Sequence, residues 1–501
     1  MSTPAPQAGR APLALLLLLG CLPALLAWGV AWIVHGAPLT TYRPQVTNDT
    51  VLYYRYAYTF SQVGLGGAPY GSDEYTAPWP VLGRFGAHGP ALVGLYGTWL
   101  ALMGTEPYKI HLFHAAWVAL AFVVLARVGR WTTRQVFWAA AALSTCAYLL
   151  FGLTNFLQEA FHSGAALLLA ALAIDLGRRK QVSAGRALLY AALLFWLAWT
   201  RMTWAFLFVP LLLGLLRPRT LGRWLLALSL ALSLALAALG LFNQTTPPGN
   251  NAVLAIIRNL LSNLPSVISM LARHLFNTIE SWLNFSWPTP LIPLLFIALA
   301  VVAYVQLARQ RRRDERALWG LILYSLFVVS AFTLAFYLGA FWSRIGSPFF
   351  LFCLMLLAHA GKTRTLAPLI VGQLIILAWF PLMISSETPD YHPDAARIAD
   401  FERAATLIVL DDDPPSDWCN TLLVDGRLLD GRLVGLPPAL GVHFLRVYDN
   451  FEAGVRSRYV WLSQAALTRL DEASAAPLAL RPIAQHENFT LYLNERSACP
   501  S

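Results

Sequence analysis

The sequence predicts a polytopic α-helical membrane protein with a small α/β or α+β domain at its C-terminus. The chain has 501 residues, of which 57% are hydrophobic and 12% are charged. A soluble protein of this size carries about twice that charged fraction. Apolar runs of membrane length recur between residues 11 and 384, as a chain that crosses about 30 Å of hydrocarbon several times requires. From about residue 385 short alternating runs typical of strands replace them.

The first apolar run, residues 11–34, is interpreted as a transmembrane helix. At about 24 residues it exceeds the apolar core of a signal peptide, and no clean cleavage site follows it. Ten further spans are predicted after it. They cover residues 107–127, 135–152, 161–176, 186–200, 203–216, 224–242, 291–308, 317–338, 347–360 and 366–384.

The positive charge of the chain follows this topology. The formal net charge of +10 would suit a nucleic-acid or lipid-surface partner, but 18 of the 36 Lys and Arg residues lie in short hydrophilic stretches, which are the segment before the first span and the turns between later spans. These turns fall on one side of the membrane, as the positive-inside rule requires. We therefore expect no nucleic-acid partner. We expect a multi-pass protein of the inner (cytoplasmic) membrane, with its N-terminus in the cytoplasm and its C-terminus on the outer, periplasmic side.

Two apolar segments are predicted not to span. Counting residues 89–104 as a span would move every later basic turn to the wrong side, so this segment is expected to lie in the outer interface. Residues 251–283 have apolar positions at helical spacing interrupted by charges, and are expected along the outer membrane face. The membrane module is thus residues 1–384, with outer loops at 35–105 and 243–290.

The predicted outer domain covers residues 385–501. Strands are expected at "ATLIVLDDD", "NTLLVDG", "VHFLRVYD" and "NFTLYLNE", while "SRYVWLSQAALTRLDEA" continues into a helical pattern. Cys419 and Cys499 both lie in this domain, where an oxidising compartment would permit a disulfide between them.

The first outer loop carries the main candidate for chemistry. Asp49 follows the first span, and Tyr53, Ala57 and Gly64 follow Asp49 at fixed offsets. Later stretches, in order, are "HGPALVGLYGTWLALMG", "HLFHAAWVALAFVVLARVGR" and "FWSRIGSPFFLFCLMLLA". Together these stretches resemble the GT-C superfamily of glycosyltransferases that use lipid-linked sugars, such as aminoarabinose transferases of lipid A and protein O-mannosyltransferases. The resemblance in topology covers residues 10–385.

The resemblance implies an inverting glycosyltransferase that takes a sugar from a polyprenyl phosphate of the undecaprenyl or dolichyl type. It implies transfer on the outer face to a glycan, lipid or protein, with Asp49 as general base and no required cofactor. Two positions depart from the family pattern. Thr50 follows the acid where the family has Glu, and His88 stands where the family often has Lys. Recognition of the donor is therefore left open.

Further candidate residues follow from the chemistry of a departing phosphate, which calls for Arg, Lys or protonated His. Arg344 has the best motif support, while Arg201 at a span boundary also suits ordinary snorkelling. The candidate substrate- or phosphate-binding residues are Tyr53, Arg55, Arg84, His88, Arg201 and Arg344.

Glu159 and His162 enter the fourth span from the outside. They are three residues apart and share one helical face. By the resemblance, Glu159 is a second catalytic acid facing the cavity. With His162 and Asp49 it is also a candidate ligand of a divalent metal ion, and the alternative is a polar helix start with a hydrogen-bonded pair.

Two other functions stay open. An oligosaccharide ligase or oligosaccharyltransferase-type enzyme would use the same loops on a preassembled glycan. A non-enzymatic lipid flippase or transporter would place charged residues deep within the spans, and few such residues are present.

Overall fold

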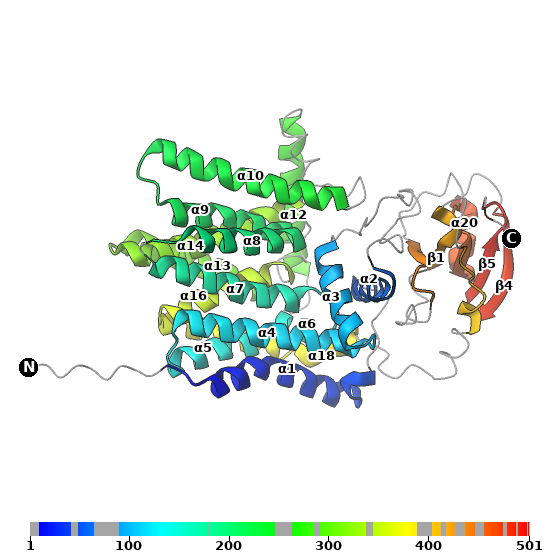
Figure 1. The fold of residues 1–501 in the computed structure, drawn as a ribbon, viewed down its shortest axis with the longest axis horizontal. Coiled ribbons are helices and arrows are strands. Elements are labelled where there is room, and N and C mark those ends of the chain that lie inside the picture. Colours follow the sequence, from blue (N-terminus) through cyan, green and yellow to red (C-terminus); the bar gives the residue numbers. More distant parts are fainter. Residues whose placement is uncertain are drawn as a thin grey trace, which may run out of the picture.

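A bundle of apolar helices and a mixed β-sheet at one end of it make up the computed structural model (Figure 1). Its described residues are 10–41, 49–64, 90–179, 181–245, 263–284, 291–336, 344–387, 403–411, 417–425, 436–445, 455–473, 478–486, 489–497 and 499.

Every predicted span coincides with helical structure. The bundle consists of α1 (Leu13–His35), α4 (Tyr108–Gly129), α5 (Thr133–Ser144), α6 (Ala147–Thr154), α7 (Glu159–Arg178), α8 (Ala184–Thr200), η2 (Met202–Leu207), α9 (Phe208–Leu216), α10 (Leu221–Thr245), α13 (Leu291–Arg309), α14 (Arg313–Phe336), α16 (Gly346–His359), α17 (Thr363–Leu377) and α18 (Phe380–Glu387).

The described helices differ in how well they suit a membrane crossing. Four of them, α1, α4, α7 and α10, are long and apolar enough by themselves, and α5 with α6 forms a bent fifth candidate. The other predicted spans are shorter apolar helices, apart from α14, whose first turn is charged. The chain is thus a multi-pass helical membrane protein, and the number eleven stays a prediction.

The predicted span 135–152 is not one continuous helix, because the chain bends by 65° between α5 and α6. Thr145 Oγ1 lies 2.9 Å from the carbonyl oxygen of Ala141 and 3.0 Å from Oε1 of Gln373 on α17. A side-chain hydroxyl that bonds to the carbonyl four residues earlier favours a bend. Neither Pro nor Gly marks this position in the sequence, so the bend gives no strong local signal.

The basic turns lie together at the end of the bundle away from the sheet. They are joined by a bridge between Arg10 and Thr132, and by hydrogen bonds from Trp131 to His359 (2.9 Å), from Arg178 to the carbonyl of Val128 (2.8 Å) and from Lys362 to Glu315 (3.0 Å). This arrangement places on one end the turns that the charge pattern assigns to the cytoplasm.

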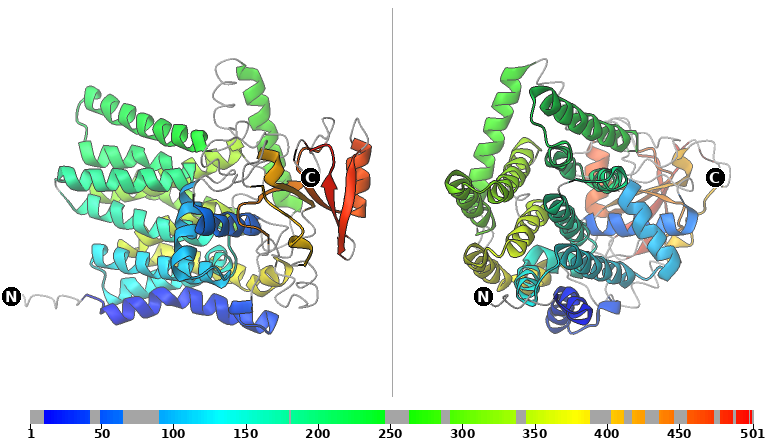
Figure 2. Two further views of the ribbon diagram at one scale, coloured as in Figure 1. Left: turned by 45° about the vertical axis from the view of Figure 1, so that its right-hand side comes forward. Right: turned by 60° about the vertical axis from the view of Figure 1, so that its left-hand side comes forward.

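Two helices of the first outer loop occupy the opposite end, α2 (Asp49–Val63) and α3 (Pro90–Met103) (Figure 1). They pack closely because Gly97 leaves room for the ring of Phe60, which would lie 2.5 Å from any Cβ at that position. α3 is the predicted interfacial helix 89–104. α12 (Leu264–Asn284) runs across the direction of the bundle helices (Figure 2), with Ile268 and Phe276 exposed.

The C-terminal residues form a five-stranded sheet in the order β2-β1-β3-β5-β4. The parallel strands β1 (Thr421–Asp425), β2 (Gly441–Leu445) and β3 (Tyr459–Ser463) are joined to an antiparallel pair, β4 (Leu480–His486) and β5 (Phe489–Asn494). The helix α20 (Gln464–Ala473) follows β3 and packs on the face that carries Val460 and Leu462. Both faces of β3 are therefore buried.

Two details of this domain differ from the sequence prediction. The stretch 405–413 was expected to form a strand, but its described residues, 405–411, continue a helical turn that begins at residue 403 and then become irregular chain. There Asp411 forms an ion pair of 2.8 Å with Arg458. β4 was not expected, and it contains Pro482 beside an irregularity in its pairing with β5. Pro is confined to edge strands or irregular positions in a sheet, and β4 is an edge strand.

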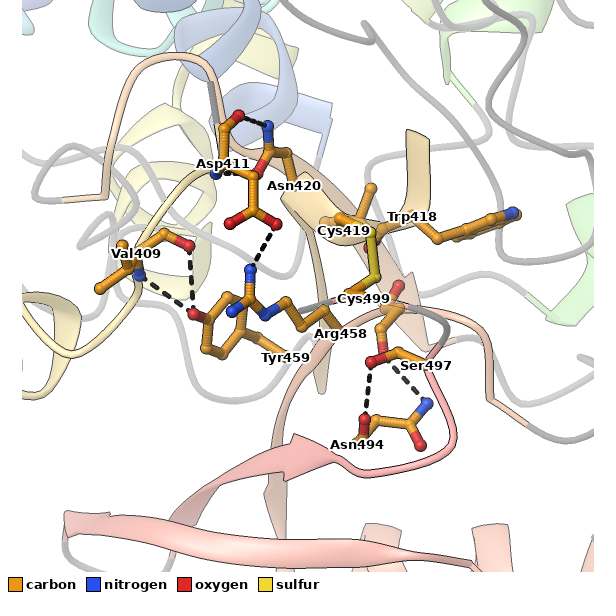
Figure 3. Close-up of a disulfide and its surroundings, with 12 residues drawn as sticks. Val409, Asp411, Trp418, Cys419, Asn420, Arg458, Tyr459, Asn494, Ser497 and Cys499 are labelled. Carbon is orange, nitrogen blue, oxygen red and sulfur yellow. Dashed lines mark hydrogen bonds and ion pairs between the residues drawn. A yellow bond between two sulfur atoms is a disulfide. The ribbon is translucent and has the colours of Figure 1, made fainter. Parts of the chain in front are cut away.

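The predicted disulfide between Cys419 and Cys499 is confirmed. Their Cα atoms are 5.4 Å apart, and the bond joins the start of β1 to the end of the chain (Figure 3). Beside it, the Tyr459 hydroxyl lies 3.1 Å from both the N–H and the carbonyl oxygen of Val409. The bond thus closes a loop of 80 residues that contains the whole sheet.

Because a long loop is closed, removing the bond by Cys419→Ser is expected to destabilise the outer domain by about 4 kcal/mol. The bond itself can be counted by thiol labelling of the denatured protein with a maleimide polymer. Three labels are expected before reduction, on Cys21, Cys146 and Cys353, and all five cysteines after reduction. Five labels without reduction would contradict the pairing.

The arrangement also predicts which end faces the cytoplasm. In Arg312→Cys, at the exposed basic end, a membrane-impermeant thiol reagent should label only inside-out vesicles. In Thr468→Cys, on exposed α20, it should label intact cells. The unsubstituted protein serves as the blank. Labelling of both positions from the same side would contradict the topology.

Candidate functional site

Three residues that are far apart in the sequence meet where bundle helices are interrupted. Glu159 is the first residue of α7, Arg201 lies between α8 and η2, and Arg344 lies two residues before the start of α16. Nη2 of Arg201 lies 3.3 Å from Oε1 of Glu159, and Nε of Arg344 lies 2.9 Å from the same oxygen. We call these residues the Glu159 cluster.

The Glu159 cluster lies at the end of the bundle that carries α2. α7 begins at Glu159 and ends at Arg178 among the basic turns, so its length of roughly 30 Å separates the two. The Glu159 side chain is 3% exposed, against 13% for Arg201 and 28% for Arg344. The carboxylate is therefore buried, while one guanidinium reaches partly into open space.

Two of the three charges in the Glu159 cluster are positive. Two guanidinium groups share one carboxylate, so the three residues of the cluster carry a net formal charge of +1. Oε2 of Glu159 and Nη1 of Arg201 are buried without a hydrogen-bond partner among the described residues. Buried polar atoms normally have partners, so an unused donor beside a net positive charge suits an anionic ligand.

Helix α2 faces this cluster with Tyr53. Tyr53 is buried and close enough to Arg201 to interact with it electrostatically. Position 49 lies one turn earlier on the same side of α2. The Asp49 side chain lies outside the described part of the structure, as do Arg84 and His88, so the predicted roles of these three residues stay predictions.

Arg55 differs from its predicted substrate-binding role. Its guanidinium is buried and donates hydrogen bonds to the C-terminal domain. The acceptors are the carbonyl oxygens of Leu436 (3.1 Å), Pro437 (2.5 Å), Pro438 (3.4 Å) and Leu440 (3.1 Å). Arg55 thus anchors α2 to the segment before β2. Its position in the chain gave no signal for this contact, which joins residues more than 380 apart.

His162 is held by the protein on both ring nitrogens. Nδ1 lies 3.1 Å from the indole Nε1–H of Trp204, and Nε2 lies 3.3 Å from Oε1 of Gln158. Nδ1 is therefore the acceptor and Nε2 the donor. Among the described residues no group of three or more His, Cys, Asp and Glu is placed to hold a metal ion. Asp49, the third candidate ligand, lies outside the described side chains, so a metal ion held by Glu159 and His162 stays a prediction.

Several residues around the cluster were not singled out in the sequence. Asn155 and Gln158 lie in the break between α6 and α7, where Oδ1 of Asn155 accepts from the N–H of Leu157 at 2.8 Å. Trp204 follows Arg201 in the stretch "AWTRMTW", and only this combination of Arg and Trp at a span boundary could have drawn attention to it.

Comparisons with known proteins identify similar structures but no family. No protein-family model matches the chain, and no curated protein sequence matches it. The crystal structure of ArnT from Cupriavidus metallidurans in the apo state is 13% identical, with a TM-score of 0.43 over 94% of this chain and 97% of that chain. The ArnT structure bound to undecaprenyl phosphate is 12% identical, with a TM-score of 0.40 over 96% and 98%. Likeness at this level carries no argument about the site.

The Glu159 cluster predicts a large effect of Glu159→Gln on stability. Without the carboxylate, the two guanidinium groups lie close together and their ion pairs are lost. The free energy of unfolding is expected to fall by roughly 2 kcal/mol. This is less than for a fully buried ion pair, because Arg344 is partly exposed. Thermal unfolding in detergent measures it. Glu315→Gln is the matched control, because its pair with Lys362 is about one quarter exposed and should contribute less than about 1 kcal/mol. Equal effects would argue against a buried charge cluster.

Proposed function

We propose that this protein is a membrane glycosyltransferase that moves a sugar from a polyprenyl phosphate to a hydroxyl acceptor at the outer membrane surface. The observation that carries the proposal is the buried Glu159 cluster, which has a net formal charge of +1 and a buried Arg201 donor with no partner among the described residues. The order of the first-loop and later sequence stretches supports the same assignment.

The proposed ligand of the two arginines is the phosphate of the donor. When the bond between the anomeric carbon and the phosphate oxygen breaks, the phosphodiester becomes a monoester and its negative charge increases. Arg201 and Arg344 then bind the departing group more strongly than the intact donor, which lowers the barrier. In this proposal Glu159 orients the two guanidinium groups, because its Oε1 accepts a hydrogen bond from each of them.

Asp49 is the proposed general base. The acceptor hydroxyl oxygen attacks the anomeric carbon from the face opposite the phosphate and inverts its configuration. The hydroxyl proton passes to the Asp49 carboxylate, and the electron pair of the broken bond remains on the phosphate oxygen. Position 49 is one helical turn from Tyr53, which is close enough to Arg201 to interact with it electrostatically, and this proposal therefore assigns the base and the phosphate site to the same end of α2.

The proposed setting is the inner membrane, with the cluster and the C-terminal domain on the periplasmic or equivalent outer side. The burial of the cluster at the end of apolar helices suits a donor whose isoprenoid chain stays in the membrane while its phosphate reaches the charged groups. The acceptor is a cell-envelope glycan, lipid or protein.

The test is transfer from labelled polyprenyl phosphate monosaccharides by the purified protein. Asp49→Asn is expected to lower kcat about 10²- to 10⁴-fold, as loss of a general base does, and to leave donor binding within about threefold. Full transfer by this variant would remove Asp49 from the reaction. Transfer is expected to survive EDTA.

Arg201→Ala or Arg344→Ala is expected to weaken donor binding about 10- to 100-fold, the effect of losing a charge-assisted hydrogen bond. Arg273→Ala is the matched control, because Arg273 is an exposed arginine of α12 that takes no part in the ion pairs of the cluster. Unchanged binding in both cluster variants would contradict the phosphate site.

A further inference from the structure

A second layer of contacts lies beneath the Glu159 cluster. Each chain segment that contributes a residue to the cluster contributes another residue to this layer. His162 follows Glu159 by three positions on α7, Trp204 follows Arg201 by three positions in η2, and Phe349 follows Arg344 by five positions in α16. The same three segments are thus joined twice.

The contacts of this layer are close and dry. Nε1 of Trp204 donates to Nδ1 of His162 at 3.1 Å, and the Trp204 ring stacks on Phe349 with centroids 4.3 Å apart and planes 20° apart. None of the three side chains is exposed to solvent. We call these residues the His162–Trp204–Phe349 column.

The column bears directly on Arg201. Arg201 lies in the interruption between α8 and η2, where the continuous helical ladder stops. Its carbonyl oxygen accepts from the N–H of Trp204 at 3.0 Å. α7 therefore holds this segment at two points, the Arg201 guanidinium through Glu159 and the Arg201 backbone through Trp204 and His162.

The hydrogen bond to Trp204 is selective for one form of His162. Gln158 accepts from Nε2–H, which leaves Nδ1 as the acceptor that the indole N–H needs. A buried indole donor normally has such a partner. An aromatic side chain without an N–H at position 204 would still stack on Phe349 but would lose the hydrogen bond to His162 on α7.

We infer that Trp204 is a positioning residue for Arg201, which acts through the His162–Trp204–Phe349 column to hold the guanidinium at the place where an anionic phosphate binds. The inference rests on the proposed function for the identity of the ligand. The positioning itself is a property of the protein and can be measured without any ligand.

The first experiment uses Trp204→Phe, which keeps an aromatic ring and removes the N–H. Binding of a polyprenyl phosphate by the purified full-length protein is expected to weaken about tenfold. Trp199→Phe is the matched control, because Trp199 lies two residues before Arg201 and its indole N–H has no partner among the described residues. If Trp199→Phe weakened polyprenyl phosphate binding as much as Trp204→Phe, the inference would be overturned.

A double-mutant cycle separates positioning from general loosening of the fold. If Trp204 acts through Arg201, Trp204→Phe should weaken binding in the unsubstituted protein and cause no further loss in Arg201→Ala. An equal loss in both backgrounds would mean that Trp204 acts independently of Arg201.

The partner residue gives a second variant in case Trp204→Phe folds poorly. His162→Gln retains an acceptor and is expected to bind within about threefold of the unsubstituted protein. His162→Phe has no acceptor and is expected to match the tenfold loss. Equal losses of binding affinity in these two variants would show that the hydrogen bond between His162 and Trp204 has no role in positioning Arg201.

The thermal unfolding of the same cycle, without ligand, distinguishes the two proposals. If the unsubstituted protein binds no polyprenyl phosphate, the proposed function fails, and unfolding still decides the positioning. The shifts in Tm for Trp204→Phe and Arg201→Ala should be non-additive, since both residues belong to one connected segment. Additive shifts would refute the column as a support of Arg201.

Discussion

The constraint on which this structure depends is that backbone polar groups cannot be left without hydrogen bonds in hydrocarbon. A helix inside a membrane can be interrupted only where other parts of the protein satisfy the freed groups. Here the interruptions before α7, between α8 and η2, and before α16 all meet at one place. Glu159, Arg201 and Arg344 stand at these interruptions, so the bundle brings its charged groups together at the points where its helices stop.

The two ends of the bundle are chemically different for separate reasons. At one end, basic residues lie in turns whose contacts are mostly hydrogen bonds to backbone and neighbouring turns. At the other end, Arg55, Arg201 and Arg344 are wholly or partly buried and bind specific carbonyl or carboxylate oxygens. Arginine in the first setting reports topology. A buried arginine, as at the second end, must be paired with an acceptor, and these pairs bring the residues of the candidate site together.

The positions of the helices could be predicted from the sequence, but the contacts between distant helices could not. Continuous apolar runs mark spans because burial in lipid leaves no other composition, and α1, α4 and α7 begin and end near the predicted residues. Glu159 and Arg344 were each identified as candidates, but their ion pair joins residues 185 apart and no local pattern encodes it. For the same reason the bend at Thr145 and the partner of Arg55 escaped prediction, since each depends on a residue from a distant segment.

The contact between Arg55 and residues 436–440 also has a consequence for how the protein is made. Arg55 is synthesised more than 380 residues before the carbonyl groups that it binds, which corresponds to about 20 to 80 s of translation. During that time the membrane helices can already be inserted, while α2 has its contacts with α3 but lacks the hydrogen bonds of Arg55 to residues 436–440. A chain released early, or clipped before residue 436, would contain the complete bundle and still lack this support. The contact therefore ties the final position of an N-terminal helix to completion of the C-terminus.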